Sequence, residues 1–152
     1  MWPVAGAVLA VAMLSGCAAP VERAPLPTAN AAPTPVPAAS SRRIVMNVIR
    51  SEVSTTSADW EPFKGEWRAA MAASAAARQA SYAAQEGEAH PTGEPGTLVV
   101  VDVSDYRYLT PAGRFGFGIM TGNAYIDAQV RMLDLQTGAV FSEESYNTSS
   151  SA

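Results

Sequence analysis

The stretch that decides the fold is TLVVVDVSDYRYL, residues 97–109. It begins with an unbroken run of apolar and β-branched residues, which is typical of a strand covered on both faces. The preceding segment, EGEAHPTGEPG (86–96), is rich in turn-forming residues and bounds the strand. We therefore predict a strand over 97–109 that occupies a central position in its sheet.

A strand and a helix are predicted upstream. RIVMNVIRSEVS (43–54) is rich in β-branched and apolar residues and predicts the first strand of the domain. After it, Ser57 or Asp59 can cap a helix, and Pro62 suits the first helical turn. The residues that recur at helical spacing are Phe63, Trp67, Ala70, Met71, Ser74 and Ala77. They predict a helix over about 60–85 whose aromatic stripe faces the core rather than a ligand.

Two further strands are predicted downstream of a glycine-rich connection, TPAGRFGFGIMTG (110–122). In NAYIDAQVRMLDL (123–135), apolar and polar residues alternate, as they do in a strand with one covered face. One face carries Ala124, Ile126, Ala128, Val130 and Met132, and the other carries Tyr125, Asp127, Gln129 and Arg131. The turn QTG (136–138) then leads to the last predicted strand, AVFSEESYNTS (139–149).

The order of these elements predicts a two-layer α/β (α+β) domain over residues 42–152. We expect one helix packed on one face of a mostly antiparallel sheet of about four strands. The other face is expected to be polar, apart from an aromatic cluster suited to docking a partner. The tyrosines expected in that cluster are Tyr106, Tyr108, Tyr125 and Tyr146. The candidate binding surface combines Tyr106, Tyr108 and Tyr125 with Phe115 and Phe117 of the glycine-rich connection.

A short apolar run precedes the single cysteine. Residues 4–14, VAGAVLAVAML, carry no charge, and their length of 11 is too short for a membrane-spanning helix, which needs about 20 residues. The run fits the apolar region of a secretory signal peptide, which we predict over 1–16. It leads into LSGC (14–17), which resembles the lipobox of bacterial lipoproteins. The resemblance implies signal cleavage between Gly16 and Cys17.

The resemblance to a lipobox also implies that acyl chains, palmitate among them, are attached to Cys17 and hold the protein at a membrane. One chain would bind only marginally, whereas several chains anchor a protein stably. Ala18, in place of an aspartate, resembles the sequences sorted to the outer membrane, so we expect the protein on its periplasmic face. The alternative, a buried cysteine in an ordinary helix, is disfavoured because the segment after Cys17 is not expected to fold.

That segment, residues 17–41, predicts a disordered linker. Six prolines fall in the 24 residues 18–41. Proline fixes φ and lacks a backbone donor, so neither helix nor sheet is expected to propagate there. Such a segment extends by about 3.1 Å per residue and would space the domain from the membrane.

Composition and motifs argue against several functional classes. The 152 residues carry a net charge of −4 without a block of lysine or arginine, which disfavours nucleic-acid binding. Gly116, Gly118 and Gly122 precede a predicted strand, whereas a phosphate-binding loop opens a helix. His90 is the only histidine in the sequence, and no aspartate or serine stands at a recognised catalytic spacing from it.

The acidic residues do not predict a catalytic set either. Asp102 and Asp105 are three positions apart on a predicted strand, so we expect them to face opposite sides rather than to act as an acid and base pair. Glu143 and Glu144 alternate on the last strand, where one of them is expected to guard a sheet edge against aggregation. With one histidine and one acylated cysteine, no metal set is expected. We therefore predict no catalytic residues, no metal and no cofactor, in a protein that is not an enzyme.

A resemblance to a known family rests on LVVVDVSDYRYL (98–109) and GRFGFGIMTGNAYIDAQVRMLDLQTGAVFSEE (113–144). These stretches combine a glycine-rich loop before a long strand with an aspartate-x-x-threonine-glycine hairpin after it. Over about residues 43–148 the chain resembles a proteobacterial lipoprotein family, domain of unknown function 4410. It is more distantly similar to the periplasmic domain of the curli-secretion lipoprotein and to the lipoprotein activators of peptidoglycan synthases.

The resemblance implies no assigned reaction. Domains of this kind usually end in a second helix, and no helix is predicted after 139–149. We therefore expect one side of the sheet to lack cover and to need a partner.

Together these observations favour an outer-membrane lipoprotein with a small periplasmic protein-binding domain, acting as an accessory or scaffold in envelope assembly. The expected partner is an envelope protein or a second copy of the chain. The alternative is a module that binds glycan or lipid in a groove between the glycine-rich connection and the sheet. The residues expected to line that groove are Tyr106, Tyr108, Phe115 and Phe117.

Overall fold

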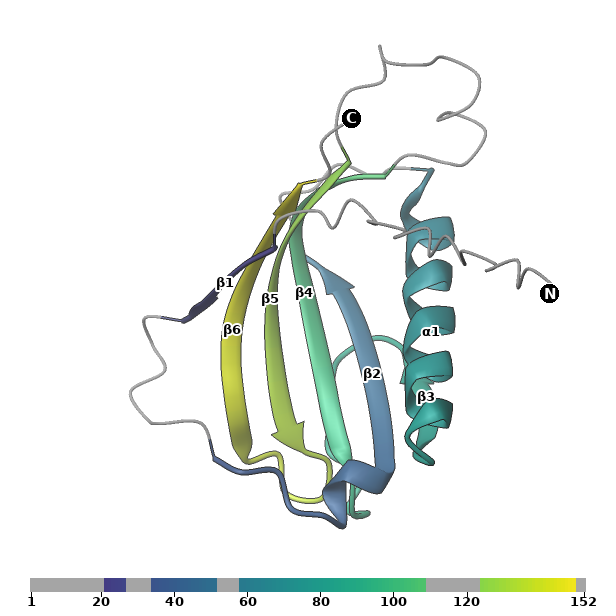
Figure 1. Cartoon of the computed structure of the whole chain (residues 1–152), viewed down its shortest axis with the longest axis vertical. Helices are drawn as coiled ribbons and strands as arrows, with labels where there is room; N and C mark the ends of the chain where they lie inside the picture. Colours follow the sequence, from purple (N-terminus) through teal and green to yellow (C-terminus); the bar gives the residue numbers. More distant parts are fainter. Residues whose placement is uncertain (1–20, 27–33, 52–57, 109–123, 150–152) are drawn as a thin grey trace, which may run out of the picture.

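The computed structural model describes residues 21–26, 34–51, 58–108 and 124–149. These residues form a six-stranded sheet with one α-helix against one of its faces (Figure 1). The elements are β1 (Val21–Pro25), a 3-10 turn (Ser40–Arg42), β2 (Arg43–Arg50), α1 (Trp60–Ala77), β3 (Ser81–Gln85), β4 (Thr97–Arg107), β5 (Tyr125–Asp134) and β6 (Val140–Ser149).

The sheet is mixed, and its strand order is β1-β6-β5-β4-β2-β3. β2 runs parallel to both β3 and β4, whereas β4, β5, β6 and β1 pair antiparallel in turn. The predicted fold class was wrong, because the described residues are mostly β and form six strands rather than about four. The parallel pair of β2 and β3 follows from the crossover through α1, since parallel neighbours need such a connection.

The predicted helix over 60–85 begins where expected but ends at Ala77. Gln79 adopts a left-handed φ of 57°, and the backbone N–H of Ala80 bonds to the Ala75 carbonyl at 2.9 Å. A left-handed residue of this kind terminates a helix. The chain after it becomes β3, which pairs with β2. Alanine-rich sequence is compatible with a helix here, and the pairing with β2 overrides that preference.

β1 lies inside the segment that was predicted to be a disordered linker, so that prediction was wrong for Val21–Pro25. The strand pairs antiparallel with β6, with Val21 opposite Thr148 and Pro25 opposite Glu144. A proline is tolerated at this position because β1 is an edge strand and ends there.

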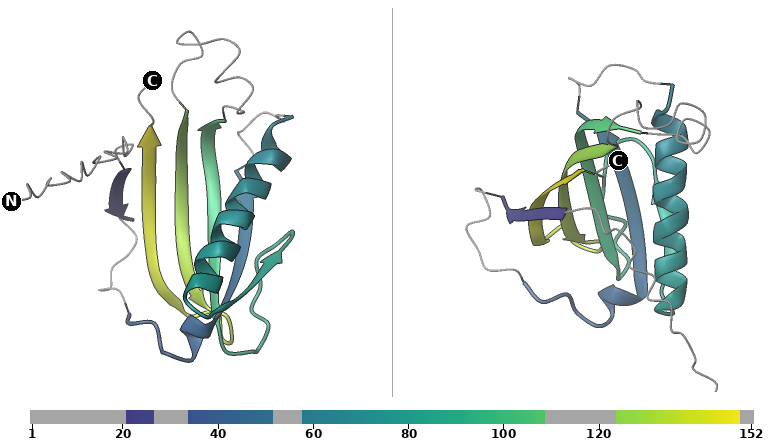
Figure 2. Two further views of the ribbon diagram at one scale, coloured as in Figure 1. Left: turned by 45° about the vertical axis from the view of Figure 1, so that its right-hand side comes forward. Right: turned by 45° about the horizontal axis from the view of Figure 1, so that its top comes forward.

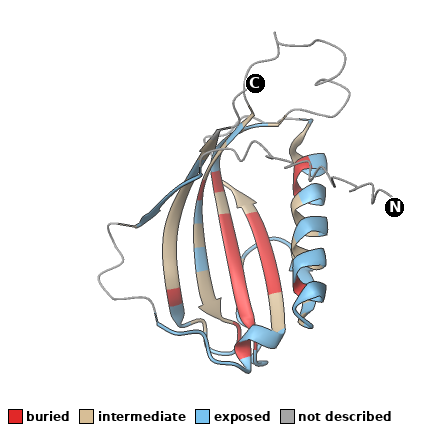
Figure 3. Cartoon of the chain, viewed as in Figure 1, coloured by how far each residue is buried: buried red, intermediate tan, exposed pale blue. Residues whose placement is uncertain are grey.

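The core explains the unbroken apolar run of β4. This strand lies between β5 and β2, so its predicted central position is confirmed. On the side of α1, the buried residues are Met46, Val48, Phe63, Val99, Val101, Val103 and Ala128. On the opposite side, they are Val45, Leu98, Val100 and Leu135. Alternate residues of β4 are thus buried on opposite faces of the sheet. Figure 3 shows buried residues along this strand.

The alternation predicted for β5 is also confirmed. Ala128 is buried in the cluster beneath α1, and Ile126, Val130 and Met132 pack against the same cluster. The apolar face of β5 therefore points to the side of the sheet that carries α1.

Leu98→Ala tests the burial of β4. Leu98 is fully buried, so its truncation is expected to lower the free energy of unfolding by about 2–5 kcal/mol through lost contacts and a residual cavity. Urea denaturation followed by tryptophan fluorescence measures the change. Val140→Ala is the control, because Val140 is 49% exposed. Equal losses in the two variants would contradict the described burial.

Candidate functional site

A β-bulge at Ser104 decides which side chains of β4 reach each face of the sheet. Val103 lies opposite Ala128 of β5, but Asp105 lies opposite Asp127, so Ser104 is the extra residue. Its hydroxyl donates a hydrogen bond to the Asp127 carbonyl at 3.1 Å. Because side chains alternate along a strand, one extra residue exchanges the faces of all residues that follow it.

The bulge places Tyr106 and Tyr108 on the side of α1, not on the polar face where they were predicted. The ring of Tyr106 lies 4.8 Å from that of Phe63 and 5.6 Å from that of Trp60. The ring of Tyr108 lies 6.1 Å from that of Phe63, and its hydroxyl donates to the Glu66 carboxylate. Both tyrosines therefore help to attach α1 to the sheet.

The other two predicted tyrosines lie on opposite faces of the sheet. Tyr125 is on the polar face opposite Arg107, and its hydroxyl donates to Asp105 at 3.2 Å. This hydrogen bond raises the pKa of Tyr125. Tyr146 lies opposite Ala128, on the side of α1. The predicted four-tyrosine cluster is therefore not formed.

Several predicted site residues are outside the described part of the chain. They are Gly16, Cys17, Gly116, Gly118, Gly122, Phe115 and Phe117.

The same bulge corrects the expectation for the two aspartates of β4. Asp102 lies opposite Gln129 and Asp105 lies opposite Asp127, so both side chains are on the polar face. Asp102 accepts a hydrogen bond from the Ser51 hydroxyl at 2.7 Å, whereas Asp105 accepts one from Tyr125. The two carboxylates have separate partners and are not bridged to each other by these contacts.

An apolar groove lies beside α1, on the face of the sheet that the helix covers only in part. α1 packs mainly on β2 and β3, which leaves β5 and β6 open on that face (Figure 2). The groove has a volume of about 390 Å³. Its lining residues are Met46, Trp67, Ala70, Met71, Ser74, Val99, Val101, Ile126, Ala128, Val130, Tyr146 and Thr148. We call this feature the apolar groove.

One wall of the apolar groove is α1 and its floor is the sheet. Ala70 and Ser74 are exposed on the helix, and Met71 is half-buried beside them. On the floor, Ile126 and Val130 are only half-buried, although they belong to the face of β5 that points to the core. The small side chains of the wall allow close approach, and the floor offers apolar area for burial.

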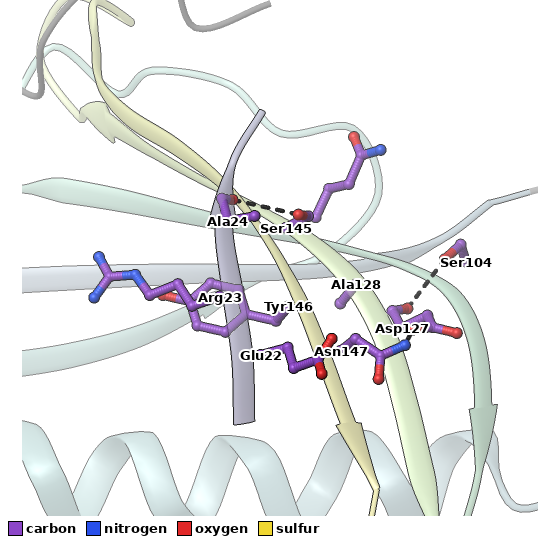
Figure 4. Close-up of a pocket in the computed structure, with 10 residues that line it drawn as sticks. Glu22, Arg23, Ala24, Ser104, Asp127, Ala128, Ser145, Tyr146 and Asn147 are labelled. Carbon is purple, nitrogen blue, oxygen red and sulfur yellow. Dashed lines mark hydrogen bonds between the residues drawn. The ribbon is translucent and has the colours of Figure 1, made fainter. Parts of the chain in front are cut away.

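A polar pocket of about 460 Å³ lies across β1, β6 and β5 (Figure 4). Its lining residues are Glu22, Arg23, Ala24, Ser104, Asp127, Ala128, Gln129, Ser145, Tyr146 and Asn147. Many of these polar groups bond to one another. Asn147 donates to the Asp127 carboxylate, and the Ser145 hydroxyl donates to the Ala24 carbonyl at 3.3 Å. The pocket thus joins strands rather than presenting a set of unpaired groups to a ligand.

A charged cluster beside that pocket holds β1 to β6. Arg23 of β1 forms an ion pair with Glu144 of β6, and its guanidinium lies 5.8 Å from the centre of the Tyr146 ring. The Tyr146 hydroxyl donates to the same carboxylate at 2.7 Å. The Arg23 hydrogen bond lowers the pKa of Glu144, and partial burial raises the pKa of Tyr146. One of Glu143 and Glu144 was expected to lie at an open sheet edge. Glu144 instead contacts Arg23 of the neighbouring strand β1.

The remaining titratable residues do not assemble a recognised catalytic or metal site. The imidazole of His90 lies 3.2 Å from the Gln85 amide nitrogen and 3.0 Å from the Glu88 carbonyl oxygen, within its own loop. Within the described ranges, no group of three histidine, cysteine or acidic side chains is placed to hold a metal ion. The helix in those ranges is also not long and apolar enough to cross a membrane.

Comparisons with known proteins give a likeness only among solved structures. No family model and no curated protein sequence match the chain. A PelC dodecamer from Paraburkholderia phytofirmans has 15% sequence identity and a TM-score of 0.47, with 88% of this chain and 83% of that chain covered. Lipoprotein GNA1162 from Neisseria meningitidis has 12% identity and a TM-score of 0.38, with 71% and 82% covered. At these TM-scores the likeness carries no argument, and the predicted family resemblance stays a prediction.

Acid is expected to detach β1 from β6. The pKa of Glu144 is lowered from its ordinary value of 4.5 in the folded protein. The ion pair therefore stabilises the pairing above that ordinary value, and its contribution is lost as the pH falls through the folded pKa. NMR spectra recorded from neutral to acid pH are expected to show the resonances of Val21–Pro25 shifting below pH 4.5, as Glu144 becomes protonated.

Two variants serve as controls for this acid transition. Glu144→Gln removes the titrating group, so the acid-induced shift of the β1 resonances below pH 4.5 is expected to disappear. Arg42→Ala removes an exposed arginine elsewhere and is expected to leave the transition unchanged. The same shift persisting in Glu144→Gln would show that another group controls the release of β1.

Proposed function

We propose that this chain is a lipoprotein of the outer membrane, held on the periplasmic side by acyl chains on Cys17, whose domain binds an envelope protein through the apolar groove. The observation that carries the proposal is the groove itself, where core-facing side chains of β5 are left half-covered. Resemblance of LSGC to a lipobox supports the anchor. Membership of family 4410 is part of the same proposal.

The shape and chemistry of the apolar groove favour a protein over a glycan. Small-ligand sites combine an enclosed apolar cavity with a few placed polar groups that fix orientation. The groove is bounded by one helix on an open sheet face, and its lining is dominated by aliphatic, alanine and aromatic side chains. Tyr106 and Tyr108, which were expected to stack on a ligand, pack against the aromatic residues of α1 instead.

The occupant that fits best is the apolar face of an amphipathic helix. Helices pack on one another at about 8–10 Å between axes, and they approach closely where side chains are small. Ala70 and Ser74 form such a wall on α1, while Val130 and Ile126 offer apolar area on the floor. A helix lying beside α1 would cover the open part of this sheet face and bury its half-exposed apolar side chains.

Ala70→Glu tests binding in the apolar groove. A charge on the exposed groove wall is expected to weaken partner binding by about tenfold or more, because burying an unpaired carboxylate opposes association. A photo-crosslinking residue at Ser74 in intact cells, followed by mass spectrometry, measures the yield of crosslinked envelope protein. The matched control is Ala69→Glu, which places the same charge on an exposed α1 residue outside the groove lining. Equal crosslinking in the two variants would contradict the proposal.

Cys17→Ser tests the anchor separately. Loss of the thiol removes the acceptor for lipid, so the variant is expected to keep its signal peptide and to run at higher mass than the processed protein. Globomycin, which blocks lipoprotein signal cleavage, is expected to give the same higher mass in the unmodified chain. Mass spectrometry and membrane fractionation measure both effects. A protein of unchanged mass and unchanged fractionation would contradict the anchor without bearing on the groove.

A further inference from the structure

We propose that β3 pairs antiparallel with β3 of a second copy of this chain, which joins the two sheets edge to edge. No residue of β3 lines the apolar groove, whose lining comes from α1, β2, β4, β5 and β6. The inference therefore does not rest on the proposed function.

The two edges of the sheet formed by the described residues differ in how far they are protected. β1, at one edge, carries Glu22, Arg23 and Pro25, and charges and prolines discourage further pairing. β3, at the other edge, has the sequence SYAAQ and contains neither a charge nor a proline. Ser81, Ala83 and Ala84 are exposed. β3 is thus the edge that remains open to another strand.

The hydrogen bonds of β3 indicate how a second strand would align. The carbonyl of Gln85 accepts a bond of 3.1 Å from the Asn47 side chain of β2, so it points toward β2. Because backbone groups alternate along a strand, those of Tyr82 and Ala84 point outward. In an antiparallel pair centred on Ala83, Tyr82 of each copy lies opposite Ala84 of the other copy. These opposed residues exchange backbone hydrogen bonds.

The charges that flank β3 favour a second copy in this orientation. Arg78 precedes the strand, and Glu86 and Glu88 follow it. Antiparallel pairing brings the beginning of each strand beside the end of the other, so Arg78 lies near Glu88 of the second copy. Two-fold symmetry repeats the contact. Parallel pairing would instead set like charges together, which is unfavourable.

Arg78 and Glu88 are suited to this contact in the single chain. Both residues are exposed, and the Arg78 guanidinium makes a long hydrogen bond of 3.4 Å to the Ser74 carbonyl. Glu86, in contrast, forms ion pairs with Lys64 and Arg68 of α1. At the centre of the pair, Ala83 faces Ala83 of the second copy, and these small side chains allow the strands to meet.

Charge reversal with complementation tests the pairing. Arg78→Glu and Glu88→Arg, each purified as the full chain, are expected to weaken self-association by about tenfold at low ionic strength, because each sets like charges together twice. An equimolar mixture of the two variants is expected to restore the dimer, because both contacts then become attractive. Sedimentation velocity measures the three samples. Arg107→Glu is the control, since it makes the same change of charge on an exposed residue of β4.

A disulfide gives a second, independent measurement. In a Cys17→Ser background, Ala83→Cys is expected to form a disulfide between two copies, because directly opposed residues of this kind lie about 4.5 Å apart between Cα atoms. Val140→Cys, exposed on β6, is the control and is expected to give none. A monomer in sedimentation with no disulfide at Ala83, failed rescue in the mixture, or a crosslink only to a different protein would each overturn the proposal.

Discussion

β4 is buried on both faces, and the rest of the structure depends on covering it. One face is covered by α1 through Phe63, while the other is covered by Leu135 and neighbouring apolar residues. On the face covered by Leu135, the backbone just before β4 must lie very close to the Leu135 side chain. A Cβ atom on Gly96 would lie 2.7 Å from Leu135 Cδ2 and 3.1 Å from the Arg43 carbonyl oxygen. Because glycine has no Cβ atom, the backbone at this position can lie close to both the Leu135 side chain and the Arg43 carbonyl.

The apolar side chains of the sheet are covered where α1 crosses it and are left partly uncovered beyond the helix. The bulge at Ser104 contributes to this arrangement. By exchanging the faces of the residues after it, the bulge turns Tyr106 and Tyr108 toward α1 and places Asp105 on the polar face. The rings of Tyr106 and Tyr108, which were predicted to bind a ligand, therefore pack against α1 instead. The open apolar area then lies on β5 and β6, on the same face as the helix.

The elements with strong local patterns could be predicted, whereas those that depend on distant pairing could not. The central place of β4, the beginning of α1 and the alternation of β5 follow from runs and periods within each segment. β1 and β3 are five residues each and owe their structure to β6 and β2. The extra residue at Ser104 has no local signature, so the faces of Tyr106 and Tyr108 were assigned wrongly. The apolar groove was missed because it needs the position of α1 relative to β5.

The position of β1 bears on how far the domain can stand from a bilayer. Val21 opens this strand four positions after Cys17, and an extended chain of that length spans at most about 14 Å. If Cys17 carries the acyl chains, the prolines after β1 do not lengthen the distance between the membrane and the sheet. The reason is that β1 is already attached to β6 through the ion pair of Arg23 and Glu144. The domain would then rest against the headgroups by the end of the sheet where β1 begins. Partners that bind at that end of the sheet would have to be embedded in, or lie directly upon, the same leaflet.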